Sequence, residues 1–152
     1  MPIKWKRTEK YLNLVRLLFN MLFITSKMDR GSLELTKSVV NFLKDKNIDY
    51  RLSKELPIAG PKKDLTNAEI DFEMIITVGD DGFILNTFRK MGKSQTPVLP
   101  IASLRGFLAN VDGLNFKHSF DLIKKGKYKI FKRARLVAKI DKTTTHIALN
   151  DI

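Results

Sequence analysis

The segment with the clearest chemical potential is the turn Gly79-Asp80-Asp81-Gly82, which follows the apolar run 72–78 and precedes a helical repeat of apolar residues. In an open α/β sheet, ligands bind at the carboxyl ends of the strands, where this turn would lie. Glycines let backbone N–H groups approach a phosphate, and a helix begins at the positive end of its dipole. Two adjacent aspartates suit bound Mg²⁺, or a carboxylate that accepts a proton from an attacking hydroxyl. A plain β-turn accounts for the same residues, because Asp and Gly are common turn formers.

The charge of the chain favours anionic partners. Its 152 residues carry 28 Lys and Arg against 16 Asp and Glu, a net charge of +12. This excess suits nucleotides, polyphosphate, nucleic acid or an acidic membrane face. Nine basic residues and one acid lie within 124–142. Because they would share one face of a strand, they indicate a solvated face or a domain interface, and nucleic acid is the less expected partner.

Other residue types restrict the chemistry further. The sequence has no cysteine, which excludes disulfides, a thiolate nucleophile and a Cys-based zinc site. Its two histidines, His118 and His146, leave little for a multi-histidine metal centre. We therefore expect neither a cysteine-based nor a multi-histidine metal centre, and we assign no metal-ligating residue.

The N-terminal residues resemble a secretory signal only in outline. A basic stretch precedes the apolar run 11–24, but Asn13, Arg16 and Asn20 interrupt that run, and Thr25-Ser26-Lys27 is a poor cleavage site. A membrane-spanning helix needs about 20 consecutive apolar residues. We expect a cytoplasmic chain with no membrane partner, in which residues 1–20 form a peripheral basic extension.

The strands and helices expected around the turn alternate along the chain. Short apolar runs predict strands at 21–26, 49–52, 72–78 and 97–102. Helical repeats predict three helices: one capped by Ser32, one that ends at Gly92 and one that ends at Gly126. Strand and helix in alternation predict a mainly parallel α/β sheet. The length suits one domain, residues 1–152.

The period changes toward the C-terminus. Apolar and basic residues alternate through 128–140, which predicts a long, half-exposed strand, and a second strand is expected from His146 onward. These two strands look like the beginning of a different unit.

A series of short motifs carries a resemblance to a known family. The turn GDDGFIL resembles the GGDGT motif, and PVLPIASLRGFLANV at 97–111 resembles a stretch of the form PVLGIN…GxLGFL. A helix with Gly-x-Tyr, the basic strand RARL at 133–136, and Ala148-Leu149-Asn150-Asp151 follow in the same order. Together they cover about residues 70–152 and resemble the NAD kinases. The Asn-Asp element distinguishes them from lipid kinases that share the first motif.

The resemblance implies a Rossmann-like N-terminal domain with flanking helices and a site between it and a β-rich domain. It implies transfer of the γ-phosphoryl of ATP, or of polyphosphate, to the 2′-hydroxyl of NAD, with Mg²⁺ or another divalent metal. Asp81 would be the catalytic residue, acting on that hydroxyl as base or orienting group. The residues expected to bind the nucleotides are Gly79, Asp80, Gly82, Phe83, Asn150 and Asp151.

The sequence departs from the family pattern at four places. Asp80 replaces a glycine of the family pattern, Phe83 a threonine, Pro100 a glycine and Ala102 an asparagine. Asp80 adds a negative charge beside the phosphate path, and Pro100 removes a donor from its strand. The chain ends at Ile152, where the family continues into the β-rich domain, so we expect a second copy or a separate chain to supply the other half of the cleft.

Two other functions compete with a working kinase. One is a non-catalytic nucleotide-binding or interaction domain whose GDDGF turn no longer supports catalysis. The other is sequence-independent binding of nucleic acid by the basic segment 124–142.

Overall fold

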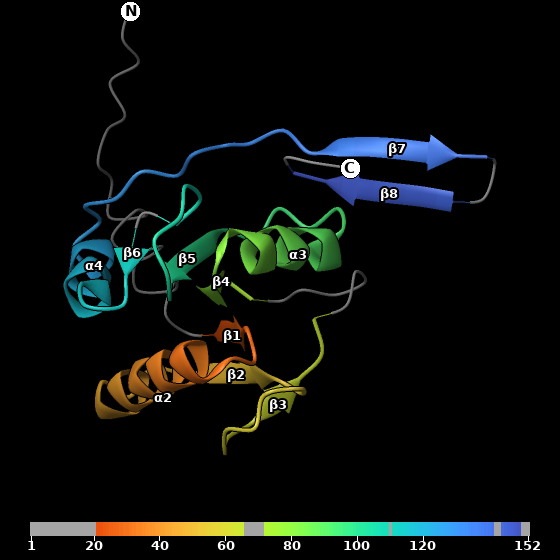
Figure 1. Cartoon of the computed structure of the whole chain (residues 1–152). Helices are drawn as coiled ribbons and strands as arrows, with labels where there is room; N and C mark the ends of the chain where they lie inside the picture. Colours follow the sequence, from red (N-terminus) through yellow and green to blue (C-terminus); the bar gives the residue numbers. More distant parts are fainter. Residues whose placement is uncertain (1–20, 66–71, 110, 142–143, 150–152) are drawn as a thin grey trace, which may run out of the picture.

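The computed structural model describes residues 21–65, 72–109, 111–141 and 144–149. Within these residues, six strands form one sheet and two more form a separate pair (Figure 1). The sheet comprises β1 (Leu22–Ser26), β2 (Tyr50–Ser53), β3 (Lys62–Lys63), β4 (Met74–Gly79), β5 (Val98–Ala102) and β6 (Val111–Asp112). The pair is β7 (Leu136–Ile140) and β8 (Thr144–Ala148), and the helices are α2 (Arg30–Asp45), α3 (Asp81–Met91) and α4 (Phe116–Lys124). The predicted α/β class is confirmed; β3 and β6 were not predicted, because two residues are too short to show a periodic pattern.

All neighbouring strands of the large sheet run parallel, in the order β3-β2-β1-β4-β5-β6. The chain moves from β1 outward to β2 and β3, then crosses back to β4 and continues to β5 and β6. The strand order therefore reverses between β1 and β4. Leu22 pairs with Met74 and Ser26 with Val78, so both strands end at the same edge. In sheets of this class, the crevice for a ligand opens at that edge, where the order reverses.

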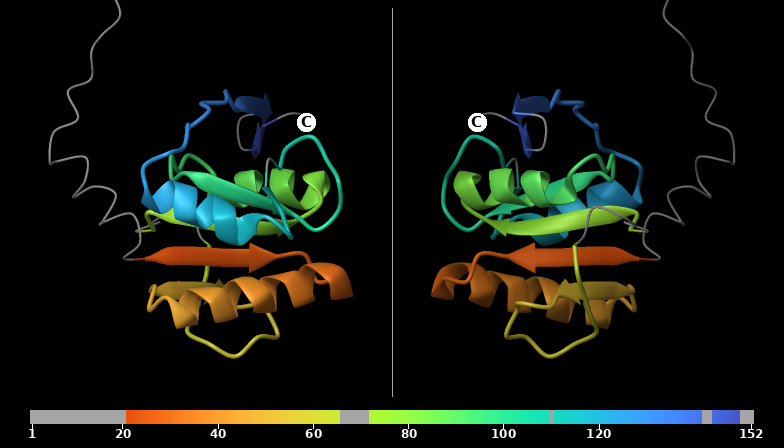
Figure 2. Two further views of the ribbon diagram at one scale, coloured as in Figure 1. Left: turned by 90° about the vertical axis from the view of Figure 1, so that its left-hand side faces the viewer. Right: turned by 90° about the vertical axis from the view of Figure 1, so that its right-hand side faces the viewer.

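Helices lie on both faces of the sheet (Figures 1 and 2), and an apolar cluster forms on each face. On one face, α2 and α4 pack against Leu22 and Ile24 of β1. On the other face, Met91 of α3 packs against Phe23 of β1 and its neighbours. Successive side chains of a strand point to opposite faces, so a strand covered on both sides is buried throughout: all five residues of β1 are buried, the apolar Leu22, Phe23 and Ile24 and then the polar Thr25 and Ser26.

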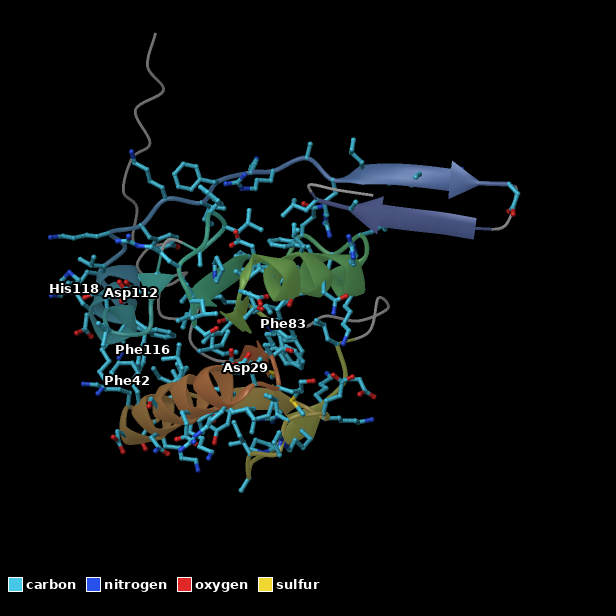
Figure 3. All side chains as sticks on the ribbon, in the orientation of Figure 1. Asp29, Phe42, Phe83, Asp112, Phe116 and His118 are labelled. Carbon is cyan, nitrogen blue, oxygen red and sulfur yellow. The ribbon has the colours of Figure 1, made fainter. Side chains whose placement is uncertain are left out.

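An aromatic contact joins the two helices on the first face. Phe42 of α2 meets Phe116 of α4 edge to face, with ring centroids 5.6 Å apart (Figure 3). Phe42 makes a similar contact with Phe120, at 5.7 Å. Such geometry places the positive edge of one ring against the negative face of another, which adds to the burial of both rings.

Helix α2 begins three residues earlier than predicted. Its N-cap is Asp29, whose carboxylate accepts the Ser32 amide at 3.0 Å and the Ser32 hydroxyl at 2.9 Å. Ser32 is fully buried inside the first turn, so its predicted role as the cap is wrong. Both residue types cap helices well, and the sequence alone does not choose between them.

Pro100 lies inside β5, opposite Thr77 of β4. Parallel pairing with β4 continues on both sides of it, from Val98 to Ala102. The proline therefore removes a donor without ending the strand.

The C-terminal region differs from its prediction. Residues 127–135 form no regular element, and β7 begins only at Leu136, so the expected strand over 128–140 is wrong in its first part. A strand needs a partner, and the antiparallel partner β8 reaches only from Ile140 back to Leu136. The β7–β8 pair lies beside α3, away from α2 (Figure 1), and Ala148 of β8 is buried. None of the helices in the described ranges is long and apolar enough to cross a bilayer.

Candidate functional site

The predicted turn lies at the edge where the strand order reverses. Gly79 ends β4, Asp80 caps α3, and Asp81 is the first residue of α3. Lys27 follows β1 directly and reaches the same place from the neighbouring strand. Parallel strands thus bring a basic side chain and two carboxylates together around the N-terminus of one helix.

Asp80 is held on two sides. One carboxylate oxygen accepts the Phe83 amide at 3.0 Å, and the other forms an ion pair with the Lys27 ammonium. The Lys27 hydrogen bond, followed by the Phe83 amide, lowers the pKa of Asp80, and the bond to Asp80 raises the pKa of Lys27. With φ of −87°, Asp80 adopts ordinary extended backbone, so this turn needs no glycine there. The aspartate's own carboxylate occupies a helix N-terminus that suits an anion.

Asp81 makes a different contact, with a loop far away in sequence. Its carboxylate accepts the backbone amides of Phe107 at 2.8 Å and Leu108 at 3.1 Å. Gly106 precedes them, and a Cβ built on it would lie 2.8 Å from Asp81 Cγ, closer than real Cβ atoms approach. The second half of the resemblance, Gly106-Phe107-Leu108, is therefore in direct contact with the first.

Of the two glycines in the turn, packing requires only Gly79. A Cβ on Gly79 would lie 3.0 Å from Phe83 Cβ, so the absent side chain makes room for the ring (Figure 3). A Cβ on Gly82 would meet nothing closer than 3.6 Å. The buried hydroxyls of Thr77 and Thr87, 3.0 Å apart, join β4 to α3 below the turn.

A second polar group lies at the same edge. The Ser32 and Ser103 hydroxyl oxygens, 2.8 Å apart, link the start of α2 to the end of β5. The Ser103 amide also donates to the Gly79 carbonyl at 3.2 Å. At the start of α2, the hydrogen bonds that Asp29 accepts from the Ser32 amide and then from the Ser32 hydroxyl lower the pKa of Asp29. The start of α2 and the ends of β4 and β5 are thus connected by hydrogen bonds.

The loop that follows β5 carries exposed apolar side chains. Phe107 is 96% exposed and Leu104 is 69% exposed. Large apolar side chains in this position are available for a ligand or another protein surface. Arg105 in the same loop is also exposed.

The described residues hold no cluster of three or more His, Asp or Glu side chains suited to a metal ion. The carboxylates of Asp29, Asp80 and Asp81 are each bound to protein donors. His118 is exposed on α4, and Asn150 and Asp151, predicted to bind nucleotide, lie outside the described residues.

Sequence reasoning missed Lys27, Gly106 and the two loop amides as members of this site. The signal for Lys27 was its place directly after a buried strand. Its partner could not be identified, because that requires knowing that β1 and β4 are neighbours. Phe107 and Leu108 lie in the motif at 97–111, but the side-chain sequence does not show that their backbone amides donate to Asp81.

Comparisons with known proteins agree with this architecture. The model of the ATP-NAD kinase N-terminal domain matches residues 21–128. The NAD kinase of Caldanaerobacter subterraneus subsp. tengcongensis is 35% identical over 131 residues, which cover 79% of this chain and 46% of the relative. The NAD kinase of Methanothermobacter thermautotrophicus is 32% identical over 111 residues, or 69% of this chain and 38% of the relative.

Two solved structures share the fold. Yeast NADH kinase complexed with NADH matches with a TM-score of 0.69 and 18% identity, over 86% of this chain and 46% of that one. An NAD kinase from Archaeoglobus fulgidus in complex with ATP matches with a TM-score of 0.53 and 22% identity, over 77% of this chain and 40% of that one.

The parallel sheet, with its turn at the reversal point, is thus an α/β domain of the type found in these kinases. The chain belongs to the NAD kinase family, as the match over residues 21–128 shows. It spans less than half the length of the relatives and structures named above.

Proposed function

We propose that this chain supplies the nucleotide-binding half of a kinase site that transfers the γ-phosphoryl of ATP, or of polyphosphate, to the 2′-hydroxyl of NAD and so forms NADP. The observation that carries the proposal is the position of Asp81 at the N-terminus of α3, on the edge where β1 and β4 end. A helix N-terminus attracts phosphate, and a carboxylate beside it can orient a ribose hydroxyl. A carboxylate oxygen has two lone pairs, so Asp81 can accept a hydroxyl in addition to the loop amides.

Each predicted residue has a part in the proposed site. Gly79 and Gly82 keep the turn open to phosphate, and Asp80 and Phe83 border the phosphate path. Asn150 and Asp151 hold NAD, by resemblance to the family. Phosphoryl transfer depends mainly on positioning and charge neutralisation. The ATP-bound Mg²⁺ and Lys27 would together neutralise the phosphate charge.

The proposed site is completed by a β-rich unit of the family type, whether that unit lies on the same polypeptide, a second copy or a separate chain. Residues 1–152 act in this proposal as one nucleotide-binding domain. A cytoplasmic location stays a prediction.

One observation favours a second candidate, nucleotide binding without turnover. The Asp80 carboxylate already pairs with Lys27, a cation at the start of α3. A bound nucleotide would meet this negative charge and would bind Lys27 less strongly.

Isothermal titration with ATP–Mg²⁺ and, separately, with NAD, together with an assay of NADP formation, decides between the candidates. We expect saturable binding of both nucleotides. In a chain that forms NADP, Asp81→Asn should lower the rate about 100-fold, since it removes a carboxylate that acts on the hydroxyl. The exposed Glu34→Gln variant, which also removes one acid from a Lys pair, should retain full activity.

Binding without NADP formation supports the second candidate. Turnover that survives Asp81→Asn unchanged contradicts the catalytic role of Asp81. No binding of either nucleotide contradicts both candidates.

A further inference from the structure

The loop between β5 and β6, residues 103–109, has little of its own to hold it in place. Residues 104–107 are exposed, and the side chains of Leu104 and Phe107 are mostly in solvent. Loops with few buried contacts open at low free-energy cost unless specific bonds hold them. The bonds that hold this loop are therefore decisive for where its exposed side chains lie.

At its beginning, the loop is tied to the sheet edge. The Ser103 amide donates to the Gly79 carbonyl at 3.2 Å, and the Ser103 hydroxyl contacts that of Ser32. Further along, two consecutive amides, of Phe107 and Leu108, donate to the two oxygens of Asp81 at 2.8 and 3.1 Å. Amide hydrogen bonds to a carboxylate are stronger than those between neutral groups.

Gly106 makes the second tie possible. A Cβ at this position would lie 2.8 Å from Asp81 Cγ and 3.0 Å from Oδ2. The described glycines with positive φ are Gly60, Gly92 and Gly126, so the backbone of Gly106 would accept alanine. The requirement for glycine is thus the close approach of the carboxylate alone. Any side chain there must displace the Asp81 carboxylate from the two amides.

We propose that Gly106 is a positioning residue of the nucleotide site: it admits the Asp81 carboxylate to the amides of Phe107 and Leu108, and this clamp holds loop 103–109 against the start of α3. The inference rests on the proposed function, because it makes the loop part of the surface that a nucleotide contacts. Asp81 then has two tasks, to face the ligand and to hold the loop. The two sequence motifs act as one unit although 25 positions separate Asp81 from Gly106.

The clamp predicts that the effect of Gly106→Ala depends on Asp81. Four full-length chains are compared: wild type, Gly106→Ala, Asp81→Ala and the double variant. In wild type, the Phe107 and Leu108 amides should exchange hydrogen slowly. Gly106→Ala should speed their exchange about tenfold or more, the equivalent of one hydrogen bond to a charged group. With Asp81→Ala already present, adding Gly106→Ala should change exchange at these amides less than about twofold, since nothing is left to displace.

Nucleotide affinity gives the functional readout. We expect Gly106→Ala to weaken binding of NAD or ATP–Mg²⁺ about tenfold, and to have less than about twofold effect in the Asp81→Ala background. Gly31→Ala is the matched control: Gly31 lies at the same sheet edge, and its Cβ would meet nothing closer than 3.5 Å. This control should leave both amide exchange and affinity unchanged.

The outcomes separate the clamp from the proposed function. If Gly106→Ala and Asp81→Ala have additive effects on amide exchange, the clamp is wrong, whatever the chain binds. If wild type binds nucleotide and Gly106→Ala binds it equally well, the positioning role is wrong and the proposed function stands. If wild type binds no nucleotide, the proposed function fails and the positioning role fails with it, while slow, Asp81-dependent exchange would still show the clamp itself.

Discussion

The two ends of helix α3 are held by charged side chains of opposite sign. At the start, the carboxylates of Asp80 and Asp81 bind amides of Phe83, Phe107 and Leu108. At the end, the Arg135 guanidinium donates to the carbonyls of Gly92 and Ser94. Each sign suits the partial charge of its helix end.

The start of α3 is suited to binding a ligand, and its end is suited to structural support. Backbone amides at the start of α3 are the kind of donor that a phosphate binds. A phosphate would therefore compete for them with the carboxylates of Asp80 and Asp81. The acceptors at the end face a permanent cation from the segment that precedes β7. Gly92 takes a positive φ of 57° there, a backbone that favours glycine. The start is therefore open to exchange with a ligand, and the end fixes the C-terminal strand pair onto the helix.

The largest effect on stability is expected at the supporting end. Arg135→Ala should destabilise the chain by about 2 kcal/mol, because it removes a charged donor from two carbonyl groups. Chemical denaturation of the full chain measures this. Arg133→Ala, at an exposed position two residues earlier, serves as the control and should have little effect. Equal stability of the two variants would show that Arg135 does not support the strand pair.

At the start of α3, a smaller effect is expected, a gain in nucleotide affinity. Asp80→Gly with Phe83→Thr should raise affinity for ATP–Mg²⁺ about tenfold, since it frees Lys27 and a helix N-terminus for phosphate. Asp80→Asn distinguishes the effect of the Asp80 charge from that of its helix cap, because asparagine is uncharged and also caps helices. Titration of these variants beside Glu34→Gln tests the idea. If affinity falls or stays level in both Asp80 variants, the account of Asp80 as a competing anion is wrong.

The smallest effect is the pH dependence of the Lys27–Asp80 pair. The lowered pKa of Asp80 means that its contribution to stability is present above the pKa of an unfolded aspartate and is lost as pH falls through its folded pKa, below 3.8. The raised pKa of Lys27 means that its contribution is complete below the unfolded pKa and is lost as pH rises through a folded pKa above 10.5. The stability difference between wild type and Asp80→Asn should thus be constant through the neutral range and shrink in acid. A difference that grows on acidification would contradict the ion pair.

The sequence predicted the local parts of this molecule well. The apolar run before Gly79 and the helical repeat after it define β4 and α3, because each periodicity follows from the element's own geometry. Gly92 and Gly126 ended their helices as predicted, both with positive φ. Ser32 was the wrong cap, because Asp29 is an equally good candidate three residues earlier.

The parts that depend on distant segments were out of reach. The alternation in 128–140 is suitable for a strand, yet β8 pairs only with its second half. The Lys27–Asp80 ion pair requires the neighbouring positions of β1 and β4, and the Asp81 clamp requires the path of a loop whose donors are backbone amides. Such contacts are determined by topology, which the local pattern of side chains does not encode.

A map of the backbone amide chemical shifts of the full chain on titration with ATP–Mg²⁺ shows whether the nucleotide binds at the start of α3. We expect saturable changes around the start of this helix, at Lys27, across 79–83 and at Phe107 and Leu108. Changes confined to the basic segment 124–139, with the start of α3 unaffected, would contradict this expectation and would place the anion-binding surface elsewhere on the molecule.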